Sequence, residues 1–186
     1  MRNSEFFKAA LKKEWREGQT RTISMPTDDF ETMMTYLRFV YGIQLPDEFD
    51  FRQLSGIPTA DQVQGCQAAY SSFAKLYILG GRLMDNTFKR AAATKIFDLF
   101  HGCSSSVCLC GPFTPGPTCV NTIYDETLES DPARRLMVDM HMKHLQHLDS
   151  EYNPRFVLDL ARGFSETLRR ETAPGLRVLE LRDYLS

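Results

Sequence analysis

The sequence predicts an α+β fold that is mostly helical, and three observations support this prediction. Apolar residues recur at helical spacing through most of the 186 residues. One short segment, residues 21–25, instead alternates polar and apolar side chains, as a strand does. Gly, Pro, Ser and Cys dominate residues 102–117, which is typical of an exposed loop. We therefore expect a domain over residues 1–101, a loop over 102–117 and a helical extension over 118–186.

The chain opens with a predicted helix, followed by the predicted strand. Ser4 is a suitable N-cap, and Gly18 is well placed to end the helix. Four apolar residues share one helical face at positions i, i+3, i+4 and i+8: Phe7, Ala10, Leu11 and Trp15. The strand runs over Arg21–Met25 and is closed by Pro26.

A second amphipathic helix is predicted next. Asp28 and Glu31 have the spacing of a capping box, and Gly42 ends the helix. Its apolar stripe is predicted to point inward. The methionines, Met33 and Met34 among them, and the aromatic residues around Tyr36–Tyr41 are predicted to be mostly core, with a minority forming an adaptable binding face. The stripe comprises Phe30, Met33, Met34, Leu37, Val40 and Tyr41. Residues 46–67 are polar and rich in Pro and Gly, so they are expected to form a surface loop.

Two further helices complete the predicted domain. The first covers residues 70–84 and carries apolar residues on two faces, so we expect it to be buried on most sides. Gly80 and Gly81 lie inside this pattern and favour close packing of a neighbouring helix. Asp85 is a good cap for the second helix, which runs to Gly102.

The extension after the loop is predicted to be helical. A short helix covers Thr118–Tyr124, and Asp131-Pro132 and Asn153-Pro154 are strong signals for the start of two longer ones. The C-terminal residues Leu176–Leu185 have a mixed pattern that fits either a strand or a helix.

Composition excludes several classes of protein. A net charge of −2 and a pI near 6.1 give no basic surface for nucleic acid. No apolar run approaches the roughly 20 residues that cross a bilayer, so we expect no membrane partner. The N-terminus lacks the apolar core of a signal peptide, and the five cysteines are an odd number. We therefore expect free thiols in the cytoplasm, the nucleus or both.

Three collinear blocks of sequence resemble the fungal branch of the BTB/POZ domain family. The first has the pattern S-x-F-F-x-A-A-L…W…E-G…R…I…P-T-D-D-F-E…Y-L-R-F-V-Y-G. The three blocks span Ser4–Gly42, Phe73–Ala91 and Ile123–Asp139. The resemblance implies a BTB/POZ-like helical core with a short residual strand.

The start of the chain departs from the family pattern. The family's domain opens with a strand hairpin and a helix, whereas here Met1 stands three residues before Ser4. A lone strand at Arg21–Met25 is not stable in water, because its backbone groups have no partner. An upstream segment, a partner from another chain, or a degenerate paralogue would each account for this. We expect an upstream segment.

The resemblance implies protein–protein interaction and no enzymatic activity. Domains of the wider family form homodimers or bridge a substrate receptor to a cullin-type ubiquitin ligase scaffold. The implied partner-binding residues are Phe7, Leu11, Trp15, Met33, Tyr36, Phe39 and Tyr41. The alternatives are a homo-oligomeric scaffold without a ligase role and a truncated paralogue that has lost the function.

Residues that commonly carry chemistry do not form a convincing site in the sequence. Cys103, Cys108, Cys110 and Cys119 lack the C-x-x-C spacing that structural zinc sites favour. The histidines at 141, 144 and 147 have no carboxylate or cysteine at ligand spacing. No nucleophile elbow or phosphate-binding loop occurs, and Asp28-Asp29 is explained by helix capping. We therefore expect no catalytic residue, metal or cofactor.

Overall fold

The computed structural model describes residues 4–25, 29–47, 49, 59–104, 113–144, 148, 150–170 and 184. Within these residues the regular structure is helical, with no strand. The α-helices are α1 (Glu5–Ala10), α2 (Arg16–Thr20), α3 (Phe30–Val40), α4 (Ala60–Arg82), α5 (Asn86–Ser104), α6 (Pro117–Glu126), α7 (Pro132–Lys143) and α8 (Pro154–Arg170). The described chain is therefore all-α, and the predicted α+β class is wrong.

The predicted residual strand at residues 21–25 is not formed. Arg21 ends α2 in the left-handed conformation, and residues 22–25 carry no regular structure. Ile23 and Met25 pack against the core while Thr22 and Ser24 are exposed. The alternation of polar and apolar residues therefore arises because this extended segment lies on an apolar surface, with every second side chain facing it. A strand also needs a hydrogen-bonded neighbour, which the described part of the chain does not supply.

The first predicted helix is broken in two. α1 ends at Ala10, and Gly18, predicted to end the helix, lies inside α2. A Cβ atom at Gly18 would stand 2.0 Å from the carbonyl oxygen of Lys12, so the chain folds back tightly between the two helices. Only glycine leaves room for that backbone contact. The N-terminal cap is as predicted, with Ser4 Oγ accepting from the N–H of Phe7.

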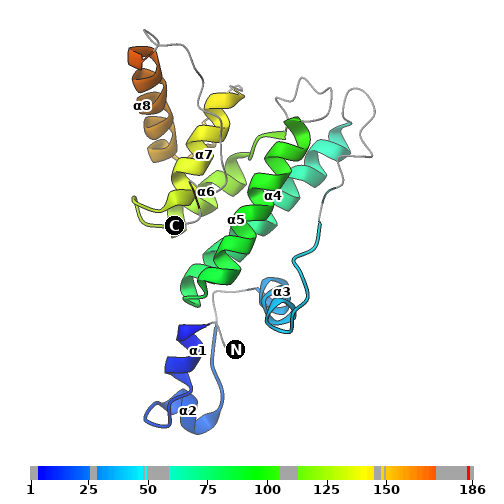
Figure 1. The fold of residues 1–186 in the computed structure, drawn as a ribbon, viewed down its shortest axis with the longest axis vertical. Coiled ribbons are helices and arrows are strands. Elements are labelled where there is room, and N and C mark those ends of the chain that lie inside the picture. The colour runs from blue at the N-terminus through cyan, green and yellow to red at the C-terminus, as the bar shows by residue number, and fades with distance from the viewer. Residues whose placement is uncertain are drawn as a thin grey trace.

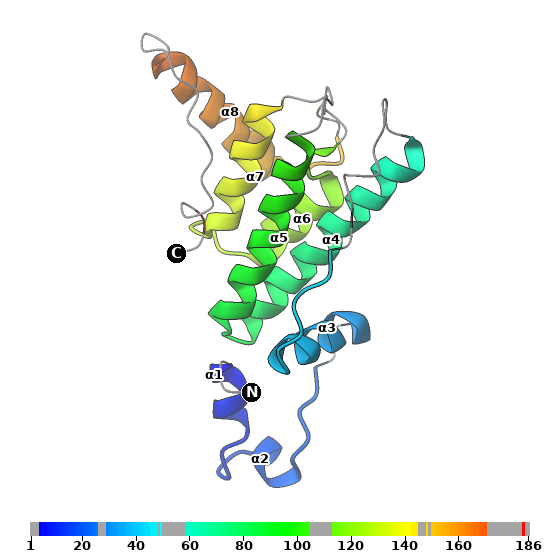
Figure 2. The same ribbon diagram turned by 45° about the vertical axis from the view of Figure 1, so that its right-hand side comes forward.

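α4 and α5 form the centre of the molecule (Figures 1 and 2). The apolar residues of α4 are buried along both faces, as its pattern predicts. A Cβ atom at Gly80 would lie 2.9 Å from the backbone of Lys89, so the predicted close packing at this glycine is confirmed. Asp85 accepts the N–H of Phe88 at 3.1 Å, which confirms the predicted cap of α5.

α4 begins ten residues before its predicted start at residue 70, so the predicted loop over 46–67 is wrong in its second half. Thr59 and Gln62 form a capping box, in which each side chain bonds the backbone of the other residue. This box satisfies the first N–H groups of the helix. It stabilises the start of a helix that contains Gly65, a poor helix former, in its second turn.

α6, α7 and α8 pack beside the upper part of the central pair (Figures 1 and 2). The starts of α7 at Pro132 and of α8 at Pro154 are as predicted. The Asp131 carboxylate accepts from Tyr77 Oη at 2.5 Å, Lys89 Nζ at 2.8 Å and the N–H of Ala133 at 2.9 Å. This one side chain therefore connects α4, α5 and α7.

The predicted exposed loop at 102–117 is buried where its last part is described. Phe113 and Thr114 lie in the core. The Gln67 amide donates to the carbonyl of Thr114 at 2.8 Å and accepts from the N–H of Gly116 at 2.7 Å. Of the segment predicted as strand or helix, Leu176–Leu185, only Tyr184 lies within the described residues.

In the part of the chain that the structure describes, no helix is both long and apolar enough to cross a bilayer.

Candidate functional site

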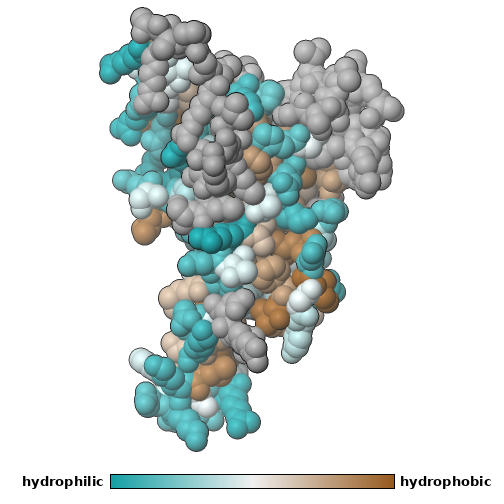
Figure 3. All heavy atoms as spheres, in the orientation of Figure 1, coloured by the Kyte–Doolittle hydropathy of each residue, from teal (hydrophilic) through white to brown (hydrophobic). Residues whose placement is uncertain are grey.

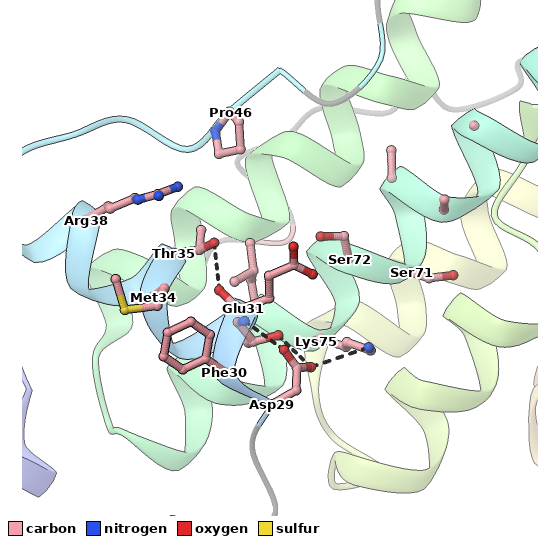
Figure 4. A pocket seen from close by; sticks show the side chains of 15 residues that line it. Asp29, Phe30, Glu31, Met34, Thr35, Arg38, Pro46, Ser71, Ser72 and Lys75 are labelled. Carbon is pink, nitrogen blue, oxygen red and sulfur yellow. Dashed lines mark hydrogen bonds and ion pairs between the residues drawn. The ribbon is translucent and has the colours of Figure 1, made fainter.

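A groove of about 800 Å³ lies between α3 and the middle of α4 (Figure 4). One wall is α3, with Phe30, Met34 and Arg38. The other wall is α4 from Gly65 to Leu76, and Pro46 stands above the gap between them. Figure 3 shows hydrophobic side chains gathered over α3 on this face of the molecule, with hydrophilic side chains beside them.

The α3 wall begins at Asp29, whose side chain caps the helix. Asp29 Oδ1 accepts the N–H of Thr32 at 2.8 Å, and Oδ2 accepts the Thr32 hydroxyl at 2.9 Å. The N–H of Thr32 is the largest cause that holds the pKa of Asp29 below its usual value. The predicted cap was the neighbouring residue Asp28, which lies outside the described residues. The N-cap of α3 is therefore one residue later than the sequence pattern predicted, and the helix begins at Phe30.

An ion pair closes one end of the groove. Lys75 Nζ of α4 lies 3.4 Å from Asp29 Oδ2 (Figure 4). Both side chains are about half exposed, so this pair contributes no more than about 1 kcal/mol to stability. It links the two walls at that end.

The inner face of α3 is anchored by Tyr36, which is completely buried. Its hydroxyl donates to Asp85 Oδ2 at 3.2 Å, and its ring meets Phe88 edge-on at 4.9 Å. Burial, reinforced by the charge of Asp85, raises the pKa of Tyr36 to about 12. Because Asp85 also caps α5, this contact fixes α3 to the turn between the two central helices.

The floor of the groove is built from small side chains. Gly65, Ala68 and Ser72 recur at i, i+3 and i+7 on α4, which places them on one helical face. On the α3 side of the groove, the side chain of Phe30 is 80% exposed (Figure 4). A side chain from another molecule could rest on this floor and contact Phe30, because Gly65, Ala68 and Ser72 are small; the larger Lys75 and Leu76 lie further along α4.

The electrostatics of the groove are balanced. Asp29 and Glu31 supply two negative charges, and Arg38 and Lys75 supply two positive ones. The lining residues include neither a histidine nor a cysteine. The hydroxyl of Thr35 donates to the carbonyl of Glu31 at 3.0 Å and has no base beside it in the lining. This chemistry suits hydrogen bonding and apolar contact with a polypeptide.

The seven predicted partner-binding residues lie outside this groove. Phe7 and Tyr36 are buried and stack at 6.2 Å, and Met33 and Phe39 are partly buried against the same core. Leu11, Trp15 and Tyr41 are exposed. The sequence pattern therefore found the correct helix in α3, but it selected mainly the face that packs inward.

The groove residues that the sequence did not reveal are Phe30 as a binding edge and the α4 wall; Met34 was among the methionines predicted to include a minority of binding residues. The apolar arc of α3 is wider than the surface that covers it, so Phe30 at its far edge remains exposed. That excess width is visible in the sequence as a stripe of six apolar residues. The α4 wall had no such signal, because most of its residues are small and do not form an apolar stripe.

The two other candidate sites of the sequence are not assembled in the described residues. Cys119 is buried in α6, and burial raises the pKa of its thiol to about 12. Cys108, Cys110, His147 and the side chain of Cys103 lie outside the described residues. His141 is buried, with Nδ1 2.7 Å from the carbonyl of Met137. Within the described ranges, no three His, Cys, Asp or Glu side chains are grouped so that they could hold a metal.

Comparison with known proteins found no matching family model, no matching curated protein and no matching solved structure.

Proposed function

We propose that this protein is a protein–protein interaction module that binds a segment of a partner protein in the α3–α4 groove. The observation that carries the proposal is the exposure of Phe30 beside a floor of small side chains. A large apolar side chain held on a fixed helix at the rim of a groove is typical of an anchor in a protein interface. The balanced charge of the groove favours a partner segment that is itself mixed in charge.

The class of partner comes from the sequence resemblance. The three blocks that resemble the BTB/POZ family support a cullin-type ubiquitin ligase scaffold as the first partner to test. Two of these blocks include α3 and the second half of α4, which form or adjoin the groove. The role of a ligase adaptor is therefore proposed as the specific form of the interaction module, and catalysis is not proposed.

The test uses two purified ligands: the N-terminal region of a cullin-type scaffold, and peptides selected from a random display library. Isothermal titration calorimetry would measure their affinity for the wild type and for Ala68→Trp, which fills the groove from its floor. We expect Ala68→Trp to weaken binding at least tenfold. A scaffold that binds both proteins equally would contradict the groove as its site.

The two ligands separate the two levels of the proposal. If selected peptides bind in the groove and the scaffold does not bind, the adaptor role is wrong and the interaction module stands. If neither binds the wild type, the proposed function is wrong.

A further inference from the structure

α8 carries a second line of apolar residues beside the one that attaches it to the bundle, and Phe164 in this line also packs against the core. Val157, Ala161, Phe164 and Leu168 follow one another at spacings of four, three and four residues. This is the spacing of the a and d positions of a helix pair, so the four side chains form a continuous line over three turns. We call this line the α8 seam. Leu168 within it is 69% exposed, Val157 and Ala161 are exposed, and Phe164 is half-buried.

The neighbouring face of α8 is fully engaged with the bundle. Phe156 and Leu160 are buried, and a Cβ atom at Gly163 would lie 2.6 Å from the Met142 sulfur of α7. At 100° per residue, the seam lies roughly 90° around the helix from this buried face. α7 therefore fixes the rotation of α8, and the seam is presented along the side of the helix.

We propose that the α8 seam binds the seam of a second copy of this chain, with the two helices antiparallel about a two-fold axis. The seam is symmetric about the point midway between Ala161 and Phe164. An antiparallel partner therefore places Val157 opposite Leu168 of the second copy, and Ala161 opposite Phe164 of the second copy. The smallest side chain meets the largest, and each pair occurs twice, as a two-fold interface requires.

The distribution of charge supports a second copy as the occupant. The charged residues of α8 lie on the remaining face, where Arg162 Nη1 and Asp159 Oδ1 pair at 3.2 Å. The seam itself carries no charge, so two copies would bury no charged group and bring no like charges together along it. A strongly acidic or basic partner would find no complementary group there.

The size of the seam sets the expected strength of the dimer. Eleven residues of helix span about 16 Å. A contact of this length buries less than the roughly 800 Å² per partner of a standard stable interface. We therefore expect a weak dimer that forms at high protein concentration.

The position of the seam gives the dimer a functional consequence. α8 lies at one end of the molecule, and α3 lies below the central pair, toward the other end, in both views (Figures 1 and 2). A dimer through α8 would leave both α3–α4 grooves open and make the module bivalent, which raises avidity for a partner with two binding segments. The dimer depends only on α8, whereas its bivalence rests on the proposed function.

Sedimentation velocity over a wide range of protein concentrations tests the dimer. The wild type should shift from monomer to dimer, and Leu168→Glu should raise the dissociation constant at least tenfold. Leu158→Glu is the matched control, because Leu158 is 51% exposed on the same helix but lies off the seam. A wild type that stays monomeric would overturn the proposal, as would equal weakening by both substitutions.

A charge-swap variant tests the antiparallel register. Val157→Lys combined with Leu168→Glu should restore the dimer, since each lysine would meet a glutamate of the second copy. Leu158→Lys combined with Leu168→Glu should not, and restoration by that pair alone would contradict the register. Circular dichroism of each variant checks that α8 remains folded. Peptide binding by the monomeric Leu168→Glu protein tests the groove without the dimer. The groove proposal and the dimer proposal can therefore fail independently.

Discussion

The bundle of α4 to α8 and the N-terminal region of α1 to α3 differ in how they are held. The bundle contributes most of the buried side chains, and polar groups such as the buried Arg134 and the half-buried Asp131 connect its helices. In the described part of the N-terminal region, only five residues are buried: Ser4, Phe7, Thr32, Tyr36 and Leu45. The same region holds half of the exposed large apolar side chains. We infer that the bundle supplies stability and the N-terminal region supplies recognition.

The largest expected effect contrasts one aromatic residue from each region. Phe73 in α4 is buried, so Phe73→Ala should lower the free energy of unfolding by about 3–5 kcal/mol. Trp15 is 59% exposed, so Trp15→Ala should change it by no more than about 0.5 kcal/mol. Urea unfolding followed by circular dichroism measures both. Comparable losses would remove the distinction between the two regions.

Adjacent glycines in α4 provide the next contrast. Gly80→Ala should destabilise the protein by about 1–3 kcal/mol, since its Cβ would press on the backbone of Lys89. A Cβ at Gly81 meets nothing within 4 Å, so Gly81→Ala should stabilise the helix by up to about 1 kcal/mol. Gly80→Ala should therefore lower the midpoint temperature of thermal unfolding, and Gly81→Ala should raise it. A shift in the same direction would contradict the close α4–α5 contact.

The bundle should also lose stability in mild acid through His141. Burial against Tyr152 and Phe156 lowers the pKa of this ring below its ordinary value near 6.5. Below pH 6.5 the unfolded chain binds a proton that the folded chain does not, so the free energy of unfolding falls as pH falls. The loss is at most about 1.4 kcal/mol per pH unit for this group.

A variant isolates that contribution. His141→Phe removes the titrating ring, so its unfolding free energy should depend less on pH between 7.5 and 5.5 than that of the wild type. Chemical denaturation at a series of pH values measures the difference. The pKa values of the Asp29 and Asp131 carboxylates are lowered, so these groups take up protons only at more acidic pH. They therefore do not obscure the contribution of His141 between pH 7.5 and 5.5. Equal slopes for the two proteins would rule out His141 as the cause.

The smallest expected effect concerns the attachment of α3. Tyr36→Phe removes the hydroxyl that donates to Asp85, at a cost of about 1 kcal/mol. Hydrogen exchange should quicken in α3 while α6 and α7 keep their protection, since those helices do not depend on this bond. Faster exchange throughout the bundle would instead mean that the two regions unfold together.

Sequence reasoning succeeded where the signal was local. The starts of α5, α7 and α8 follow from Asp85, Asp131-Pro132 and Asn153-Pro154, because a cap acts on the backbone within three residues. The burial of α4 also followed from a local signal, because apolar residues on two faces of one helix predict that both faces are covered. These signals do not depend on what lies on the other side of the fold.

The remaining features depend on contacts between distant segments. The strand at residues 21–25 was predicted from alternation alone, which cannot reveal whether a neighbouring strand exists. The groove depends on how α3 crosses α4, and Phe30 differs from the half-buried Leu37 only through that crossing. Periodicity assigns both residues to one stripe, so their different exposure could not be predicted.

The most direct test of groove binding uses two exposed residues that differ mainly in position. Phe30 at the groove is 80% exposed, and Leu128, between α6 and α7, is 78% exposed. Isothermal titration calorimetry with a peptide selected from the display library on the wild-type protein would compare Phe30→Ala and Leu128→Ala with the wild type. We predict that Phe30→Ala weakens binding at least tenfold while Leu128→Ala leaves it unchanged. Equal affinity for all three proteins would contradict recognition through the α3–α4 groove.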